Sequence, residues 1–141
     1  MIYIHIPFCR SFCTYCDFYS EVAAKCRKAE EQQRQQALFD EFGEALALEA
    51  QLRSGEMSDE VNTLYIGGGT PSVLPLSVFE RLLEALRSCG HGGPYEEFTV
   101  EVNPEDIVEK GHEYVEGLLK LGVNRISMGV QSFDDGILEW M

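Results

Sequence analysis

The 141-residue sequence contains no cluster of Lys and Arg, and its formal net charge is −13. Because phosphate binding needs such clusters, we expect no nucleic-acid partner. It also lacks an uninterrupted apolar run of the ~18 residues that a membrane-spanning helix needs. The first residues, MIYIHIPF, lack the cationic segment and long apolar stretch of a secretory signal. These absences favour a soluble, cytoplasmic protein, and an apolar share of 45% is enough for a hydrophobic core.

Strand-like and helix-like segments alternate along the chain. Short β-branched and aromatic runs predict strands over residues 1–6, 61–69, 98–102 and 124–132. Apolar residues at helical spacing predict helices over about 37–54, 77–89, 105–121 and 134–141. Right-handed crossovers between such units predict an α/β fold with a parallel sheet and helices outside it. Four units cannot close a barrel, and the last helix stops almost as soon as it starts, so we expect the chain to be part of a longer one.

The helical spacing also predicts which side chains face the core. The residues expected to face inward are Leu38, Phe42, Ala45, Leu46 and Leu52 in the first helix, Phe79, Leu82, Leu83 and Leu86 in the second, and Leu118 and Leu119 in the third. Ser77 with Glu80 matches a capping box at the start of the second helix. Gly122 is expected directly after the third helix, and Met128 is expected in the core.

Five cysteines are present, and Cys9, Cys13 and Cys16 crowd into eight residues behind the first strand. Three closely spaced cysteines are an odd number, and in a reducing compartment such a group favours metal binding over disulfides. A structural zinc site needs a fourth ligand, and neither Cys26, in a linker-like polar run, nor Cys89, at a helix end, is a good candidate. Three thiolates that leave one iron of a cube-type cluster open fit the spacing better. Zinc and a disulfide stay open as alternatives.

Two other strand ends carry unusual residues. Gly67, Gly68 and Gly69 follow the second strand, where glycines permit a close backbone approach or a positive φ. The sequence there matches neither the phosphate loop nor the G-x-G-x-x-G pattern. Glu101 lies between two valines in the third strand, and a carboxylate in an apolar strand is costly unless it is paired. Asn103 is expected to cap the following turn or helix.

The spacing C-x3-C-x2-C, with an aromatic residue before the third cysteine, resembles the signature of the radical SAM superfamily. The longer string YIHIPFC…C.YC.F resembles the branch related to oxygen-independent coproporphyrinogen III oxidase. The resemblance runs through four motifs in order, one at each strand end. It implies a partial (β/α)6 TIM-like barrel, of which residues 1–141 would form the N-terminal part of the core domain, with further barrel units and a C-terminal domain beyond it.

The same resemblance implies the cofactors and their ligands. Cys9, Cys13 and Cys16 would hold a [4Fe-4S] cluster, whose free iron binds S-adenosylmethionine (SAM). Tyr3, Gly68 and Glu101 would contact that SAM. The residues expected at a second SAM molecule are Tyr15, Gly69, Thr70 and Gln131. Aromatic residues between the cysteines would shield the cluster from water: Phe8, Phe12, Tyr15 and Phe18.

One departure from the oxidase pattern distinguishes functions within the branch. The oxidases carry a further cysteine two positions after the third, where this sequence has Phe18. Phenylalanine at that position resembles the haem chaperone subfamily, which binds haem and is thought to pass it to acceptor proteins, so membrane contact would come only through an acceptor. The alternative is an enzyme, the oxidase, which would need an electron donor and would act on a tetrapyrrole. A zinc-binding interaction module is a third interpretation. The Gln-rich segment 30–36 has no predicted role.

Overall fold

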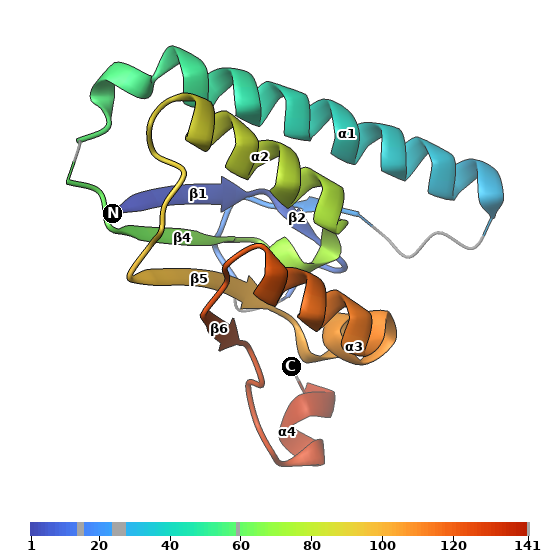
Figure 1. Ribbon diagram of the computed structural model, residues 1–141. Coiled ribbons are helices and arrows are strands. Elements are labelled where there is room, and N and C mark those ends of the chain that lie inside the picture. The colour runs from blue at the N-terminus through green and yellow to red at the C-terminus, as the bar shows by residue number, and fades with distance from the viewer. Residues whose placement is uncertain (14–15, 24–27, 59, 141) are drawn as a thin grey trace.

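The computed structural model describes residues 1–13, 16–23, 28–58 and 60–140. Its centre is a four-stranded sheet in which every neighbouring pair is parallel, in the order β1-β4-β5-β6 (Figure 1). These strands are β1 (Ile2–Ile6), β4 (Thr63–Gly68), β5 (Glu97–Val102) and β6 (Arg125–Met128). The parallel α/β fold predicted from the sequence is therefore confirmed.

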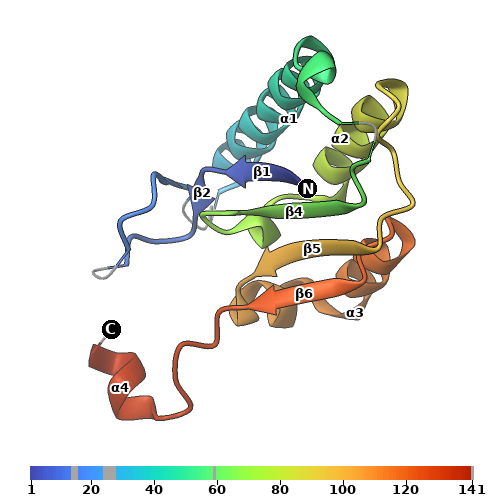
Figure 2. The ribbon, with the colours of Figure 1, turned by 90° about the vertical axis from the view of Figure 1, so that its left-hand side faces the viewer.

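Helices connect the strands and lie outside the sheet (Figures 1 and 2). The connecting helices are α1 (Ala29–Leu52), α2 (Leu76–Ser88) and α3 (Pro104–Lys120), and a short helix, α4 (Asp135–Trp140), follows β6. Two single 3-10 turns, η1 (Ser54–Glu56) and η2 (Pro71–Val73), follow α1 and β4. Within the described residues, no helix is both long and apolar enough to cross a membrane.

A second, two-stranded sheet was not predicted. β2 (Phe8–Cys9) pairs in parallel with β3 (Glu21–Val22), so the chain on both sides of the cysteine loop is held together. Strands of two residues are too short to show a period of two in the sequence, which is why no pattern indicated them.

Alternation along the main strands separates an apolar face from a polar face. Ile4, Ile6, Ile66 and Val100 are each at most 7% exposed and pack towards the helices. The residues between them point to the opposite face of the sheet, and many of these carry polar groups. They include Tyr3, His5, Tyr65, Thr99, Glu101, Arg125 and Ser127.

The predicted inward face of α1 is confirmed for Phe42 and Leu46 and wrong for Leu38, Ala45 and Leu52. Leu38 and Leu52 are 44% and 77% exposed and Ala45 is also exposed, whereas Phe39 is 4% exposed. The helix begins at Ala29, earlier than predicted, and packs on α2 and the core through Phe39, Phe42, Gly43, Leu46 and Ala50. The polar run therefore forms the first turns of α1 and is not a linker.

Three smaller predictions about the helices and β6 are also wrong. α2 begins at Leu76 behind Pro75, so Ser77 lies inside its first turn and does not cap it. Leu119 is 63% exposed because only Leu118 of that pair faces the core. Met128 is 44% exposed because β6 is an edge strand of this sheet. The predicted Asn103 cap of α3 is confirmed, since its side chain accepts a hydrogen bond from the Glu105 backbone N–H.

Candidate functional site

All four strands of the main sheet point the same way, so their carboxyl ends meet at one edge of the molecule (Figure 2). The cysteine loop extends beyond this edge behind β2, and the segment after β6 leads to α4 on the same side (Figure 2). In open parallel sheets, ligands bind at this edge.

The glycine segment lies directly against the chain that leads into the cysteine loop. The backbone N–H of Gly69 donates to the Ile6 carbonyl at 2.7 Å, and that of Thr70 donates to the Phe8 carbonyl at 2.6 Å. The Thr70 hydroxyl lies 3.6 Å from the Cys9 sulfur. A Cβ on Gly69 would come within 2.6 Å of the Phe8 carbonyl oxygen and 2.9 Å of the Cys9 sulfur. Glycine is therefore required here for the close approach of Cys9.

Glu101, in β5, connects that strand to the same glycine segment. One carboxylate oxygen, Oε1, accepts from the Tyr65 hydroxyl at 2.6 Å, and the other, Oε2, accepts from the Gly68 backbone N–H at 3.0 Å. Gly68 has φ +115°, a backbone conformation that favours glycine. The carboxylate is thus paired, as the sequence required, and it faces the polar side of the sheet.

Two tyrosines accompany this carboxylate. The Tyr3 and Tyr65 rings lie 5.9 Å apart between centroids on neighbouring strands. The hydrogen bond to Glu101 raises the pKa of Tyr65, and partial burial and the Glu101 charge add to that rise. Burial and then the Glu101 charge raise the pKa of Tyr3. Both phenols therefore stay neutral at physiological pH beside one negative charge.

His5 connects the sheet to the far side of the cysteine loop. Its Nε2 lies 3.2 Å from the Tyr19 carbonyl oxygen, and its Nδ1 lies 3.2 Å from the Tyr3 hydroxyl. Since a carbonyl can only accept, Nε2 of His5 donates to the Tyr19 carbonyl, and Nδ1 shares the second hydrogen bond with the Tyr3 hydroxyl. The alternation of His5 with two isoleucines indicated its face, but no sequence signal indicated Tyr19 as its partner.

The cysteines supply the right donors without being gathered around one point. Cys9 is half-buried at the strand edge, and Cys13 and Cys16 are exposed; all three are free thiols. Among the described residues, no three Cys, His, Asp or Glu side chains are placed to hold a metal ion together. Three unpaired thiols on one loop beside the strand ends nevertheless fit the donor set that an iron–sulfur cluster takes.

The aromatic residues of this loop divide between core and surface. Phe8 is 3% exposed and packs edge-on against Phe39 and Phe42 beneath α1, so it belongs to the core and cannot shield a cluster. Phe12 and Phe18 are 74% and 67% exposed beside the cysteines. Tyr15 and Cys26 lie outside the described residues.

Gln131 follows β6 at the same edge of the sheet. Its φ of +64° is unusual for a residue with a side chain, and such strained backbones gather at functional sites. Its side-chain nitrogen folds back over Gly129. The described part of the structure gives no hydrogen bond between Gln131 and Gly69 or Thr70, and the second-SAM set stays a prediction.

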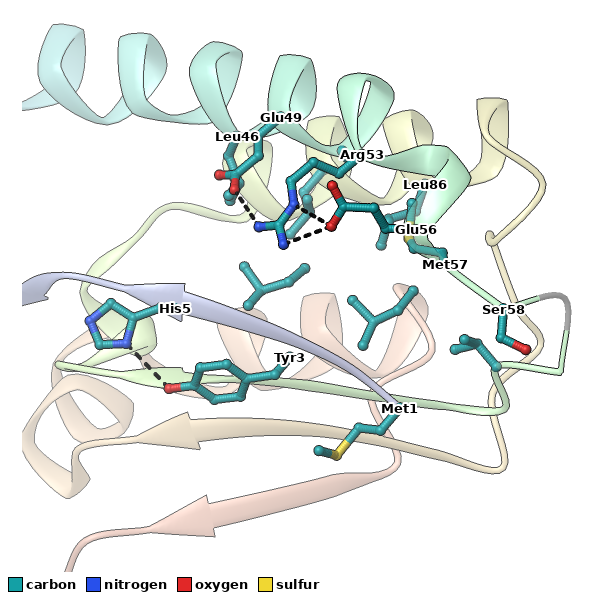
Figure 3. Close-up of a pocket in the computed structure, with 15 residues that line it drawn as sticks. Met1, Tyr3, His5, Leu46, Glu49, Arg53, Glu56, Met57, Ser58 and Leu86 are labelled. Atoms are coloured by element: carbon teal, nitrogen blue, oxygen red, sulfur yellow. Dashed lines mark hydrogen bonds and ion pairs between the residues drawn. The ribbon is translucent and has the colours of Figure 1, made fainter.

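A groove of about 590 Å³ lies along β1, an edge strand of the described sheet, and beneath the end of α1 (Figure 3). Arg53 projects into it between Glu49 and Glu56 and forms ion pairs with both. Tyr3 and His5 also line the groove. Two carboxylates face one guanidinium, so these three side chains carry a net negative charge.

Sequence comparison identifies the class of protein to which this site belongs. The profile of the Radical SAM superfamily matches residues 3–141, and the chain belongs to that superfamily. Membership implies a [4Fe-4S] cluster and SAM as cofactors. The strand-end position of the cysteines, glycines and Glu101 agrees with this.

The relatives fall into two functional groups. The chain is 42% identical over 137 residues to a heme chaperone HemW of Lactococcus lactis, and the match covers 97% of this chain and 32% of the relative. It is 32% identical over 135 residues to an oxygen-independent coproporphyrinogen III oxidase of Bradyrhizobium diazoefficiens, covering 94% and 27%. The solved coproporphyrinogen III oxidase HemN of Escherichia coli, described as a radical SAM enzyme, superposes with a TM-score of 0.78 at 32% identity, covering 97% and 29%. The chain thus spans between 27% and 32% of the length of these relatives.

Proposed function

We propose that Cys9, Cys13 and Cys16 hold a [4Fe-4S] cluster and that SAM binds at the neighbouring strand ends, in contact with Gly68 and Glu101. Residues 1–141 would form the N-terminal part of the radical SAM core domain. Tyr3 would lie beside the same SAM. A second SAM at Tyr15, Gly69, Thr70 and Gln131 stays a prediction.

The observation that carries this proposal is the meeting of three motifs at one edge. The Thr70 hydroxyl lies 3.6 Å from the Cys9 sulfur, and the neighbouring Gly68 N–H lies 3.0 Å from the Glu101 carboxylate. A cluster on the cysteine loop would therefore stand beside glycine backbone and a carboxylate. Glycine carbonyls can accept hydrogen bonds from the ammonium group of SAM, and the carboxylate can bind its cationic or hydroxyl groups.

For the protein as a whole we propose the haem chaperone function, which consists of binding haem and delivering it to an acceptor protein. Phe18 supports it, because the oxidase pattern has a cysteine there. The Phe18 side chain is 67% exposed on the cysteine loop, so it offers an apolar surface where the oxidases would present a thiol. The similarity to a heme chaperone HemW also supports it.

Anaerobic reconstitution of the complete protein tests both parts. We expect about four irons per chain and a brown protein that then binds haem in an optical titration. Cys9→Ser, Cys13→Ser and Cys16→Ser should lose the iron. Cys89→Ser is the matched control, because Cys89 lies away from the loop and contacts the Ala50 carbonyl. Iron uptake without haem binding would overturn the chaperone proposal, and a colourless protein with one zinc would overturn the cluster.

The second candidate is the coproporphyrinogen III oxidase, which is favoured by the similarity of fold to the Escherichia coli enzyme. Incubation of the reconstituted protein with SAM, a reductant and coproporphyrinogen separates the two candidates. Loss of propionate carboxyl groups as CO₂ would establish the oxidase and contradict a carrier that does no chemistry on the tetrapyrrole.

A further inference from the structure

A fully buried carboxylate lies beneath the strand ends. Asp106, in the first turn of α3, is 0% exposed. Its Oδ2 accepts from the Ser72 hydroxyl at 2.5 Å, and its Oδ1 forms an ion pair with Nε of Arg10. Apart from that ion pair, Oδ1 has no hydrogen-bond partner in the described part of the chain. A buried charge is costly unless it is paired, so Arg10 is what makes this carboxylate tolerable.

This carboxylate connects three motifs that are far apart in the sequence. Arg10 directly follows Cys9, and Ser72 lies shortly after the glycine segment in η2. The Ser72 hydroxyl oxygen also accepts from the backbone N–H of Asn103 at 3.0 Å, just beyond Glu101. One chain of polar contacts therefore connects the cysteine loop, the glycine segment and the end of the strand that carries Glu101.

The anchor on α3 is itself firmly held. Arg10 reaches a second carboxylate on the same helix, with Nη1 at 2.5 Å from Oε2 of Glu109. The Lys110 ammonium donates to three successive carbonyls of the η2 region, those of Ser72, Val73 and Leu74, at 2.6, 3.1 and 2.8 Å. An arginine whose guanidinium contacts two fixed carboxylates has little freedom, and neither has the residue next to it.

We propose that Arg10 is a positioning residue for the iron–sulfur cluster: by pairing with Asp106 and Glu109 it fixes the first turn of the cysteine loop and so sets where the Cys9 thiolate stands. The inference rests on the proposed cluster function and adds a residue to it. The Arg10 guanidinium contacts α3, so its influence on the cluster would pass through the neighbouring Cys9. Residues that orient a metal ligand in this way influence metal affinity and redox potential.

The test compares variants of the anaerobically reconstituted protein. Arg10→Ala removes both ion pairs. Arg10→Lys keeps a positive charge for Asp106, but a single ammonium cannot reproduce the planar guanidinium that contacts both carboxylates. Arg53→Ala is the matched control, because Arg53 also pairs with two carboxylates, Glu49 and Glu56, but lies at the end of α1 away from the cysteine loop. Iron content, the rate of iron loss to a chelator, the reduction potential and the EPR spectrum are measured for each.

We expect Arg10→Ala to lose iron about 10- to 100-fold faster than wild type, the effect typical of removing a group that orients a metal ligand. Its EPR spectrum and potential should shift as well. Arg10→Lys should fold and fall between wild type and Arg10→Ala, and Arg53→Ala should resemble wild type. If Arg10→Ala fails to fold, the Arg10→Lys result alone decides.

Suppose that Arg10→Lys and Arg10→Ala fold and lose iron at the wild-type rate, with the wild-type potential and EPR spectrum. This result would overturn the positioning role and leave the cluster function standing. A lower melting temperature without any change in the cluster would have the same meaning, because a merely structural ion pair predicts it. A wild-type protein that takes up no iron would overturn the proposed function, and the positioning role with it.

Discussion

Glu101 connects β5 with β4 on the polar face of the sheet. Both of its carboxylate oxygens are engaged, one by the Tyr65 hydroxyl and the other by the Gly68 N–H. A ligand that binds Glu101 must therefore compete with these hydrogen bonds or add to them. The hydrogen bond to Glu101 is the main cause of the raised pKa of Tyr65, whereas burial comes before the Glu101 charge as the cause at Tyr3.

Replacing Glu101 by Gln should lower the pKa of Tyr65, because the amide removes the negative charge and weakens the hydrogen bond that raises it. The pKa of Tyr3 should fall less, since burial is its larger cause. Tyrosinate absorbance measured against pH tests this, with Tyr65→Phe to identify the titration of Tyr65. An unchanged Tyr65 titration in Glu101→Gln would show that the two groups are not in contact.

The same substitution should weaken SAM binding by about 10- to 100-fold, because a hydrogen bond to a charged group contributes about 1.5–3 kcal/mol. Calorimetric titration of the reconstituted protein with SAM measures it. Glu97→Gln is the control: Glu97 is half-buried at the opposite end of the same strand, where it pairs with Arg125. Equal affinities for wild type and Glu101→Gln would remove Glu101 from the SAM site.

Lys110 makes a pH-dependent contribution to stability. Burial, with the nearby Arg10 charge, lowers its pKa to about 8 from the ordinary 10.5, although Asp106 and Glu109 act in the opposite direction. Between these two pKa values the unfolded chain holds the extra proton, so the stability contributed by this group rises with pH. The free energy of unfolding of wild type should therefore rise relative to that of Lys110→Met between about pH 8 and about pH 10. A difference that is constant or falls in urea titrations would contradict the buried position of the ammonium.

At the scale of elements, tertiary packing decides which face of α1 turns towards the core. Leu38 and Phe39 are adjacent and both apolar, and the spacing alone allowed either to face inward. The structure places Phe39 in the core because Phe8, at the exit of β1, offers an aromatic edge there at 5.2 Å between ring centroids. A contact between segments that far apart in the sequence leaves no local pattern.

Phe39→Ala should therefore lower the free energy of unfolding by about 3–5 kcal/mol, the cost of emptying an aromatic core position. Leu38→Ala, one residue away and 44% exposed, should cost less than about 1 kcal/mol. Chemical denaturation of both variants measures the difference. Equal losses, or a larger loss at Leu38, would indicate that Leu38 faces the core, as the sequence predicted.

The end of β4 is the other element where packing is restrictive. Gly69→Ala should cost about 1–3 kcal/mol, because its Cβ would overlap the Phe8 carbonyl and the Cys9 sulfur. Gly55→Ala is the matched control, with no atom within 4 Å of the added Cβ, and should stay within about 0.5 kcal/mol of wild type. A neutral Gly69→Ala in the same denaturation experiment would mean that the glycine segment does not press against Cys9.

Much of this architecture follows from local patterns, and the rest depends on contacts across the sheet. The four main strands, the α/β order and the capping of α3 by Asn103 were predictable because each depends on residues close in sequence. The partners of Glu101 and Asp106 were not. Tyr65 looks like an ordinary strand residue until its hydroxyl is placed beside Glu101, and Arg10 looks like a solvated charge until α3 packs behind the cysteine loop.

At the scale of the whole molecule, strong negative charge coexists with exposed apolar surface. The net charge is −13, while Met128 is 44%, Phe133 95% and Trp140 86% exposed on β6 and beyond it. β6 is also an edge of the described sheet, and unprotected edges promote pairing between chains. Mutual repulsion between the acidic chains opposes such association.

The isolated chain should therefore associate more strongly as salt rises, because the screening length shrinks from about 10 Å at 0.1 M to about 3 Å at 1 M. Met128→Lys should reduce the association by placing a charge on the β6 edge. Leu48→Lys, on the exposed side of α1 at 55% exposure, should leave it unchanged. Sedimentation velocity at both salt concentrations measures this. A chain that is monomeric at high salt, or two lysine variants with equal effects, would contradict the role of the β6 edge.

The central claim is that three cysteines hold a cluster with one iron left open for SAM. The EPR spectrum of the reduced, anaerobically reconstituted protein, recorded before and after addition of SAM, tests it most directly. The account predicts the signal of a reduced [4Fe-4S] cluster, absent in Cys13→Ser and retained in Cys89→Ser, and a change in that signal when SAM binds the open iron. A protein without a cluster signal, or with a signal that SAM leaves unchanged, would contradict it.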